Sequence, residues 1–296
     1  GVRGGAQVGG SPYPTTDTMD YFTIPTAGNA IDFGNLTQNK FGPGGAGSRT
    51  RGLFMCGGLP SRLAEVDYIA FASTGNAQDF GDMTVARACG GNGATSNETR
   101  AIVASGSSGS SDWDDTIDYV TIASTGNGVD FGNLIAGSGG CQFTSSTTRG
   151  IMCGFSLAPN YAYSNRIDFI TMASTGNATD FGGDMAWTGN GRSCSNGIRS
   201  VSSSNRTPAA TTDLQSGFIA SRGNFTEYGD LASTNDGGGS FATSDTTRGV
   251  FGMKTPAATN IMEYISMTTA GTGVDFGDLT QAIGNSGATS NAHGGL

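Results

Sequence analysis

The sequence predicts an all-β fold built from repeats of about fifty residues, and three observations lead to that prediction. First, one phrase recurs six times, and its clearest copy runs from Ile117 to Leu134. Second, β-branched and aromatic residues dominate both ends of that phrase, as they do in strands. Third, 50 of the 296 residues are glycine and only 8 are proline, without a collagen-like triplet, so glycine is expected in turns and close-packed strands.

Each copy of the phrase is expected to form a β-hairpin. In the clearest copy, strands at residues 117–122 and 129–134 flank the turn Ser124-Thr125-Gly126-Asn127. Glycine and asparagine both tolerate a positive φ, and a loop of about four or five residues is common in hairpins. The sequence therefore predicts a positive φ at the turn glycine of four copies, namely Gly75, Gly126, Gly176 and Gly223.

Two acidic positions mark the copies. The first recurs after 47, 51, 50, 47 and 48 residues, at Asp20, Asp67, Asp118, Asp168, Gln215 (the exception) and Glu263. The second belongs to an acid-aromatic-glycine triplet on the return strand, at Asp32, Asp79, Asp130, Asp180, Glu227 and Asp275. A ring of carboxylates could bind cations or sugars, but residues repeated in every unit usually build the unit. We therefore expect these acids to be internal and to accept hydrogen bonds from turn amides or pair with arginines.

A second motif, Arg-Gly followed by an apolar run, precedes each hairpin. The clear copies begin at Arg51, Arg149 and Arg248. Weaker copies begin at Arg100 and Arg199, which are followed by Ala101 and Ser200, and Arg3-Gly4 is assigned to the same series. Before it lies a stretch rich in Gly, Ser and Ala, such as residues 88–97 and 138–146, which suits a strand crowded near an axis. Each period thus holds four short antiparallel strands. Six periods are most simply a six-bladed β-propeller, with residues 1–296 as a single domain.

The two ends of the chain suggest how such a ring closes. The chain starts at the second strand of a unit and finishes with a small-residue first strand at residues 282–291. We expect this C-terminal strand to share one blade with the N-terminal strand near residues 3–8, because that pairing removes an open sheet edge. The first residue is Gly1 rather than Met, which indicates a processed chain or a fragment of a longer one.

These residues resemble kelch repeats. The similarity lies in an apolar run ending in Gly57-Gly58, a later Tyr68, an aromatic residue on the next strand and a segment closing on Arg87. The chain departs from the kelch pattern in three ways. The aromatic residue on the next strand is Phe or Tyr rather than Trp, its distance in sequence from the preceding Tyr is longer, and the paired glycines are often lost. More closely, the whole chain resembles the kelch-like repeats of virion structural proteins in tailed bacteriophages, notably marine and cyanobacterial ones. That resemblance implies a kelch-like propeller in an extracellular virion.

Charge and composition argue against several other classes. The net charge of −9 and only two lysines, Lys40 and Lys254, disfavour nucleic acid as a partner. No apolar run approaches transmembrane length and no signal-peptide pattern opens the chain, so membrane insertion is not expected. The five cysteines have no zinc-site or disulfide-framework spacing, and we expect them to pack as small core residues: Cys56, Cys89, Cys141, Cys153 and Cys194. With a single histidine, no metal or cofactor is expected.

No group of residues in the sequence predicts catalysis. His293, the single histidine, is expected to be a surface residue at the chain end rather than a base. The segments that join the strands differ most between repeats, and loops on rigid scaffolds often carry function. Trp113 and Tyr161 lie in two such segments and are the candidate contact residues.

The sequence and the resemblance together favour a non-enzymatic structural or adhesive virion component, such as a capsid decoration, tail or fibre protein. Its expected partners are other virion proteins and a host-surface glycan or protein. A glycan-binding propeller lectin is the alternative, although Trp113 and Trp187 occupy unrelated repeat positions. A propeller enzyme, such as a glycan-processing enzyme or a copper-radical oxidase, is disfavoured because no His, Tyr and Cys ligand set is evident.

Overall fold

The regular elements of the chain are β-strands. The computed structural model describes residues 1–9, 14–58, 60–109, 113–160, 162–186, 191–203, 211–235, 239–255 and 257–292. Throughout these residues the strand pairings are antiparallel, which confirms the all-β prediction. The described residues include no helix that is long and apolar enough to cross a membrane.

Most strands fall into six groups that follow the sequence repeats. Group 1 consists of β27 (Gly287–Thr289), β1 (Val2–Val8), β2 (Thr15–Tyr21) and β3 (Ile31–Lys40). Group 2 consists of β4 (Gly44–Gly47), β5 (Arg51–Gly57), β6 (Leu63–Ala70) and β7 (Gln78–Asp82). Group 3 consists of β8 (Ala94–Ser96), β9 (Arg100–Ala104), β10 (Thr116–Thr121) and β11 (Val129–Asn133). Group 4 consists of β13 (Gln142–Ser145), β14 (Arg149–Cys153), β17 (Arg166–Thr171) and β18 (Thr179–Asp184). Group 5 consists of β19 (Ser193–Ser195), β20 (Arg199–Ser203), β21 (Thr211–Phe218) and β22 (Thr226–Asn235). Group 6 consists of β23 (Phe241–Ser244), β24 (Arg248–Thr255), β25 (Ala257–Ser266) and β26 (Val274–Gly284). A small separate sheet holds β12 (Ser138–Gly139), β15 (Ser156–Leu157) and β16 (Ala162–Tyr163).

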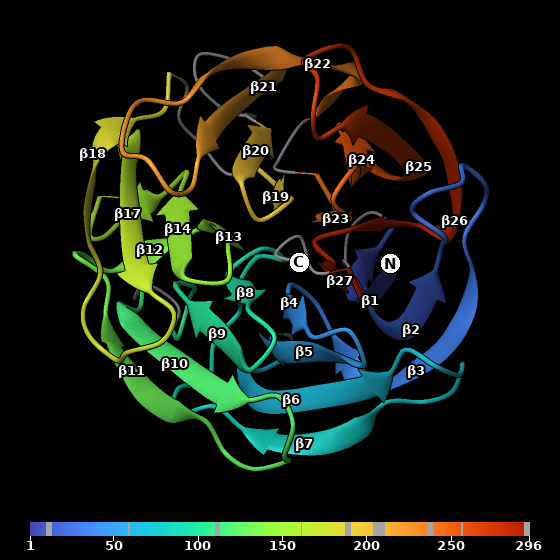
Figure 1. Cartoon of the computed structure of the whole chain (residues 1–296). Coiled ribbons are helices and arrows are strands. Elements are labelled where there is room, and N and C mark those ends of the chain that lie inside the picture. The colour runs from blue at the N-terminus through green and yellow to red at the C-terminus, as the bar shows by residue number, and fades with distance from the viewer. Residues whose placement is uncertain are drawn as a thin grey trace.

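The innermost strands of the groups face a common centre (Figure 1). Residues of β4, β8, β13, β19, β23 and β27 line one narrow cavity of about 70 Å³. These strands carry the small residues that the sequence assigned to an axis, but they are shorter than the predicted segments: β8 covers only Ala94–Ser96 of residues 88–97. The arrangement is compatible with a β-propeller-like shape.

Serine hydroxyls join the innermost strands of consecutive groups. Each Oγ donates to a backbone carbonyl oxygen at the equivalent position of the preceding group: Ser96 to Gly47 and Ser145 to Ser96 at 2.6 Å, and Ser195 to Ser145, Ser244 to Ser195 and Ser290 to Ser244 at 2.7 Å. Gly47 holds the sixth such position, where a Cβ would lie 2.6 Å from the carbonyl oxygen of Arg51. Small polar residues suit these strands because the backbones approach closely and each buried carbonyl still gains a donor.

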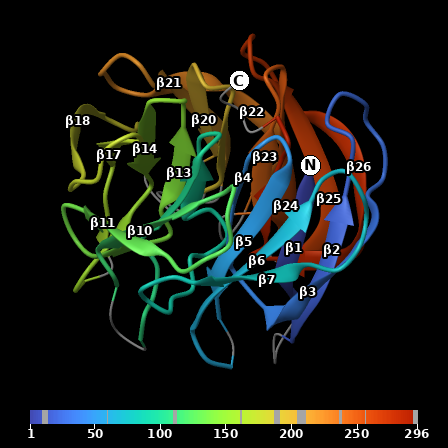
Figure 2. The same cartoon turned by 60° about the horizontal axis from the view of Figure 1, so that its bottom comes forward.

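The C-terminal strand pairs with the N-terminal strand, as the sequence predicts. The Cα partners are Val2 with Thr289, Arg3 with Ala288 and Gly4 with Gly287. β1 also pairs with β26, and Figure 2 shows β1 and β2 beside β25 and β26. Groups 1 and 6 therefore form one larger curved sheet. One detail is corrected: residues 282–284 belong to β26, and the last strand is only Gly287–Thr289.

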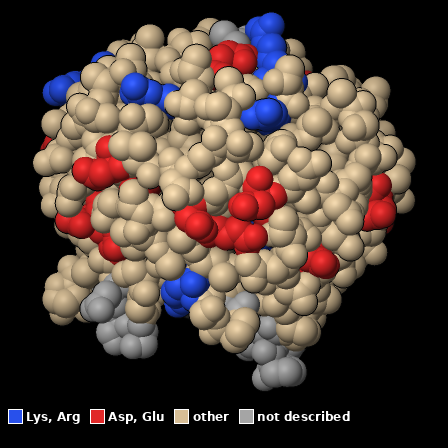
Figure 3. Space-filling view, turned by 90° about the horizontal axis from the view of Figure 1, so that it is seen from below, with Lys and Arg blue, Asp and Glu red and all other residues tan. Residues whose placement is uncertain are grey.

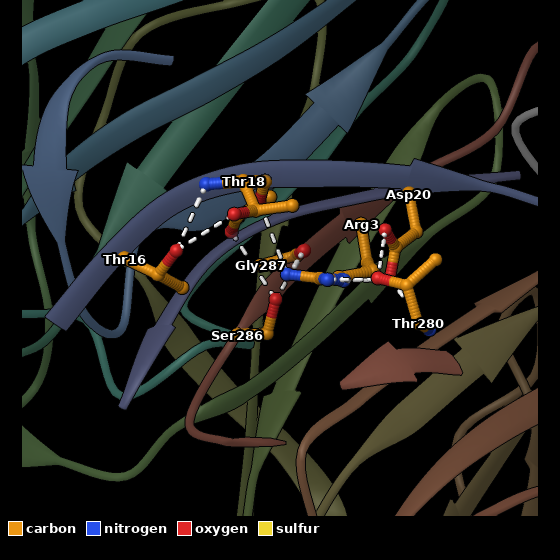
Figure 4. Close-up of polar contacts among 8 residues, drawn as sticks. Arg3, Thr16, Thr18, Asp20, Thr280, Ser286 and Gly287 are labelled. Atoms are coloured by element: carbon orange, nitrogen blue, oxygen red, sulfur yellow. Dashed lines mark hydrogen bonds and ion pairs between the residues drawn. The ribbon is translucent and has the colours of Figure 1, made fainter. Parts of the chain in front are cut away.

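Buried side chains reinforce this junction (Figure 4). Arg3 Nε donates to Asp20 Oδ2 at 3.0 Å, and Arg3 Nη2 contacts the same oxygen. Asp20 Oδ1 accepts a hydrogen bond from Thr280 Oγ1 of β26 at 2.7 Å. Ser286 Oγ donates to the carbonyl oxygen of Gly4 at 3.2 Å. The two ends of the chain are thus joined by side chains as well as by strand pairing.

The strand register corrects the sequence alignment at the N-terminus. Val2 pairs with Tyr21 as Leu53 pairs with Tyr68, so Gly1 is equivalent to Gly52. Arg3 is then equivalent to Phe54 and does not belong to the Arg-Gly series. The sequence could not reveal this because Arg3-Gly4 matches the local pattern, whereas the register depends on the partner strand.

The predicted hairpin is present, and it contains a β-bulge. Ile117 pairs with Gly132 and Asp118 with Asp130, which leaves Phe131 without a partner. The bulge directs Phe131 into the core while Asp130 stays at the surface. The loop, at residues 122–128, is longer than predicted. The predicted positive φ is found in all four turns: 153° at Gly75, 156° at Gly126, 157° at Gly176 and 152° at Gly223.

Each hairpin loop packs against the outer strand of the preceding group. The amide of Gly126 donates to the carbonyl oxygen of Phe80 at 2.8 Å, and Asn127 Oδ1 accepts from the amide of Asp82 at 3.1 Å. The same backbone bond recurs from Gly28 to Phe276, Gly75 to Phe33, Gly176 to Phe131 and Gly271 to Tyr228. Because two backbones meet here, glycine is required by space: the triplet glycine makes this contact at Gly34, Gly81, Gly132, Gly229 and Gly277, and in group 4 the next residue, Gly183, makes it.

Candidate functional site

The acids that start each phrase are buried, and Asp67 and Asp118 join neighbouring groups. Asp67 Oδ2 lies 2.7 Å from Lys40 Nζ, and Asp118 Oδ2 lies 2.6 Å from Arg87 Nη2. Thr84 Oγ1 also donates to Asp118 Oδ1 at 2.5 Å. Lys40, Thr84 and Arg87 all come from the outer strand, or the segment after it, of the preceding group. This first set of acids is internal, as expected, and its role is structural.

The cations that pair with these acids are not the expected ones. Within the described residues, the acids pair with Arg3, Lys40, Arg87 and Arg166. The Arg-Gly arginines instead lie over aromatic rings: Arg51, Arg100, Arg149, Arg199 and Arg248. The sequence suggested the wrong pairing because the partners are set by strand register and packing. Lys40 and Arg87 reach Asp67 and Asp118 from the preceding group, whereas Arg166 lies two positions before Asp168 on the same strand and faces the same side.

The acids of the acid-aromatic-glycine triplets are exposed, contrary to the expectation that they are internal. The aromatic side chain of each triplet is buried, because the β-bulge turns it toward the core while the side chain of the acid points to solvent. Three of these acids accept a hydrogen bond from the amide two residues later: Asp79 at 3.0 Å, Asp130 at 3.2 Å and Asp180 at 2.6 Å. The donors are the glycines of the same triplets, Gly81, Gly132 and Gly182, which lie within the return strands and not in the hairpin turns as expected. Figure 3 shows a band of acidic side chains across the side of the molecule on which β6 and β7 lie.

All five cysteines are buried free thiols, as the sequence predicts. Burial raises the pKa of the Cys153 and Cys194 thiols to about 12. They therefore remain protonated at neutral pH, and a protonated buried thiol is a poor nucleophile. The cysteines act as small core residues.

Trp113 lies between β9 and β10 and is half-buried. It forms a β-bridge with Ser107. Its ring covers Gly139 of β12 so closely that a Cβ on Gly139 would overlap the ring. Trp113 is thus held in place by the small sheet rather than projecting freely from a loop. The second candidate, Tyr161, lies outside the described residues, as do Trp187 and His293.

Trp113 lines a cavity of about 170 Å³ together with Arg62 and Arg192. The other lining residues are Phe41, Ala88, Gly90, Ser107, Gly140 and Asn285. Gly90, Gly140, Arg192 and Asn285 come shortly before β8, β13, β19 and β27. The cavity therefore lies at the end of the central axis where the innermost strands begin.

Arg192 is a buried cation, with only 3% of its surface exposed. Its guanidinium donates to the carbonyl oxygens of Gly191, Ser240 and Gly239 and to Asn285 Oδ1, at 2.9, 3.3, 3.2 and 3.3 Å. Burial lowers the pKa of Arg192 to about 10, so the side chain is still charged at neutral pH. Arg62 Nη2 donates to Ser107 Oγ at 3.0 Å. In the described part of the chain, neither arginine forms an ion pair with a carboxylate.

Two cations beside an aromatic ring favour an anionic group in this cavity. A buried charge without a counter-ion is costly, and a carboxylate or similar anion would compensate it through charge-assisted hydrogen bonds. The sequence analysis did not identify Arg62 or Arg192, because the fold brings together residues far apart in the chain. One signal in the sequence was available: Arg192 stands within a segment whose other residues have small side chains.

In the part of the chain that the structure describes, no cluster of three or more His, Cys, Asp or Glu side chains could hold a metal ion. The chain matches no protein-family model and no curated protein sequence.

Proposed function

We propose that the chain is a six-bladed kelch-like β-propeller in which the N- and C-terminal strands share the closing blade. The innermost strands of all six groups line the same narrow cavity, which supports this proposal. Each innermost strand contacts the next, and β27 contacts β4, so the contacts run round the centre. The pairing of β27 with β1 supports closure by the chain ends.

We further propose that the protein is a non-enzymatic structural or adhesive component of a tailed-phage virion, as a capsid decoration, tail or fibre protein. One observation supports a scaffold role: the polar residues that recur in the repeats form hydrogen bonds and ion pairs between neighbouring groups of strands. Asp118, Asn127 and Ser145 and their equivalents hold one group of strands against the next. Closed β structure with such cross-links is rigid, which suits a part exposed outside a cell. The virion assignment itself rests on the resemblance of the repeated phrase.

Contact with partners is assigned to the end of the axis that carries Trp113. Arg62 and Arg192 supply positive charge there, and the ring of Trp113 supplies an apolar face. An acidic group on another virion protein, or on a host-surface glycan or protein, would match this chemistry.

Quantitative mass spectrometry of purified virions tests the proposal. A virion component should be present at a fixed copy number relative to the major capsid protein. This ratio should stay constant during density-gradient purification and repeated washing of the particles. Absence from washed particles, with the protein present in the infected-cell lysate, would refute the virion role.

A glycan-binding lectin is the second candidate, and the pairing of Trp113 with two arginines favours it, because acidic sugars present both an apolar face and a carboxylate. Binding to a panel of acidic and neutral glycans distinguishes a lectin from a purely structural part. Elemental analysis addresses the enzyme alternative: stoichiometric copper or zinc in the purified protein would favour an oxidase or a hydrolase.

A further inference from the structure

Group 5, at the top of Figure 1, departs from the repeat near the end of β21. Ser216 pairs with Thr226, and the residues that hold the serine's position in the other groups are all aromatic: Tyr21, Tyr68, Tyr119, Phe169 and Tyr264. Two residues further along β21, Phe218 stands where group 3 has Thr121, and 51% of its surface is exposed. Group 5 has therefore lost a packed ring and gained an exposed one.

The missing ring leaves a larger cavity. In group 3, Tyr119 lines a cavity of about 150 Å³ beside the hairpin loop. The equivalent cavity in group 5 measures about 310 Å³, and Arg199 joins its lining, while the other lining residues of the two cavities hold equivalent positions. In group 3 the ring of Tyr119 covers the arginine, with its centroid 4.7 Å from Arg100 Cζ. Serine is too short to do the same, so the cavity of group 5 reaches a cation.

A neighbouring substitution shows that the core side of β21 is repacked and that the cavity side is not. Gly217 stands where group 3 has the core residue Val120, and Phe225 fills the vacated space. A Cβ on Gly217 would lie 2.3 Å from that ring. Phe225 is buried and replaces a small residue, Gly128 in group 3. The loss of the inner side chain is thus compensated, whereas the space beside Ser216 stays open.

Arg199 also lacks the contact that the other stacked arginines make with the next group. Their Nη1 atoms donate to backbone carbonyl oxygens there: Arg51 to Ile122 at 2.9 Å, Arg100 to Met172 at 3.1 Å, Arg149 to Ile219 at 2.9 Å and Arg248 to Ile24 at 3.4 Å. Among the described residues Arg199 has no such bond, and its Nη1 donates to Ser216 Oγ at 3.3 Å. Tyr228, where the other groups have phenylalanine, bonds to the next group instead, through its hydroxyl and the carbonyl oxygen of Ser266 at 2.9 Å.

The lining of this cavity is cationic and rich in hydroxyl groups. Arg222 stands where group 3 has Thr125, and its guanidinium Cζ lies 5.1 Å from the ring centroid of Phe169 in group 4. Within the described residues, neither Arg199 nor Arg222 forms an ion pair with a carboxylate. Three hydroxyl-bearing residues line the same cavity: Ser216, Ser221 and Thr226.

We propose that this cavity binds a carboxylated sugar. The carboxylate pairs with the guanidinium groups of Arg199 and Arg222, the sugar hydroxyls bond to the serine and threonine hydroxyls, and the apolar face of the sugar ring lies on Phe218. An apolar ligand would leave the two cations without a counter-charge, and a small inorganic anion would leave the face of Phe218 uncovered. The cavity shares no lining residue with the one beside Trp113, and the inference does not depend on the virion assignment.

The test uses the complete 296-residue chain, and the probes are the methyl glycosides of glucuronic, galacturonic and N-acetylneuraminic acid. In an NMR titration at least one probe should bind with a dissociation constant on the order of 1 mM, with the largest shifts at Gly217, Phe218 and Thr226. The methyl ester of the same glycoside keeps the ring without the charge and should bind at least about tenfold more weakly, as should sulfate. Failure of all three probes to bind, equal binding of the ester or of sulfate, or shifts that lie elsewhere would overturn the proposal.

Two variants locate the site. Ser216→Tyr restores the ring of the other groups and should abolish probe binding while the fold is kept. Arg222→Thr introduces the residue of group 3 and should weaken binding several-fold. Its melting temperature should change little, because the Arg222 side chain is exposed. Unchanged probe binding in either folded variant contradicts the site directly.

Arg62→Gln is the matched control, because it removes a cation from the cavity at the end of the axis and leaves group 5 intact. It should not change binding of the probe. Loss of binding in Arg62→Gln but not in Arg222→Thr would place the sugar at the axis. That result would overturn the site in group 5 and still support the lectin candidate, so the two ideas fail separately.

Discussion

A Cβ atom on Gly81 would lie 2.6 Å from the carbonyl oxygen of Gly126, a residue in the hairpin loop of the next group of strands. The equivalent contact recurs between Gly34 and Gly75 at 2.5 Å and between Gly132 and Gly176 at 2.5 Å. A triplet glycine and a turn glycine from consecutive copies of the repeated phrase are therefore two sides of one junction between neighbouring groups. The glycine of the triplet leaves room for the backbone of the next loop.

The first prediction follows from this contact. Gly81→Ala should lower the free energy of unfolding by about 1–3 kcal/mol, because the new methyl group meets backbone atoms that cannot move aside. Gly126→Ala is the matched control: its φ of 156° is also unfavourable for alanine, but no atom lies within 4 Å of its Cβ. Chemical denaturation of both variants measures the difference. Equal destabilisation by the two substitutions would mean that backbone conformation, not the contact, decides the choice of glycine.

The second prediction concerns the junction between the chain ends. Truncation after Asn285 removes β27 and Ser286 and leaves one edge of β1 unpaired over residues 2–4. The melting temperature should fall and the protein should aggregate more readily on heating. Truncation after Ala292 keeps β27 and serves as the control, with little change expected. If both truncated chains melt at the same temperature as the full chain, the junction does not stabilise the fold.

The third prediction concerns pH. Burial raises the pKa of Asp118 above the usual value for aspartate, and the hydrogen bond from Thr84 and the charge of Arg87 only partly oppose this. The folded protein therefore binds this proton at a higher pH than the unfolded chain does. The contribution of the carboxyl group to stability is fully present below the unfolded pKa and is lost as the pH rises through the folded pKa.

We expect the difference in free energy of unfolding, wild type minus Asp118→Asn, to increase as the pH is lowered from about 7 to about 4. Urea denaturation at a series of pH values measures this difference. A decrease on acidification would show that Arg87 lowers the pKa of Asp118 by more than burial raises it.

The fourth prediction concerns the cavity at the end of the axis. If the proposed acidic partner binds there, Arg62→Gln should weaken attachment about tenfold or more, because a charge-assisted hydrogen bond contributes about 1.5–3 kcal/mol. The melting temperature should barely change, since among the described residues Arg62 donates a single hydrogen bond, to Ser107. Arg49→Gln is the control: its side chain is 65% exposed and pairs with Glu98. Incorporation into particles and adsorption to host cells are the measurements, and equal effects of the two variants would argue against the cavity as the contact site.

The sequence alone determined the repeat, the all-β class, the hairpin with its positive-φ glycines, and the pairing of the two chain ends. These features depend on local conformation and on periodicity, which a single sequence displays directly. It also predicted correctly that Asp118 and its equivalents are internal. For Asp130 it was wrong, because a β-bulge turns Phe131 inward and leaves the acid outside.

The tertiary structure decided which side chains meet across groups. Arg87 pairs with Asp118, Gly81 meets Gly126, and Arg62 and Arg192 face the same cavity as Trp113. Such contacts depend on the register between strands and on how consecutive groups pack, and neither is encoded in a local pattern. The same reason explains why Arg3-Gly4 matched the wrong motif.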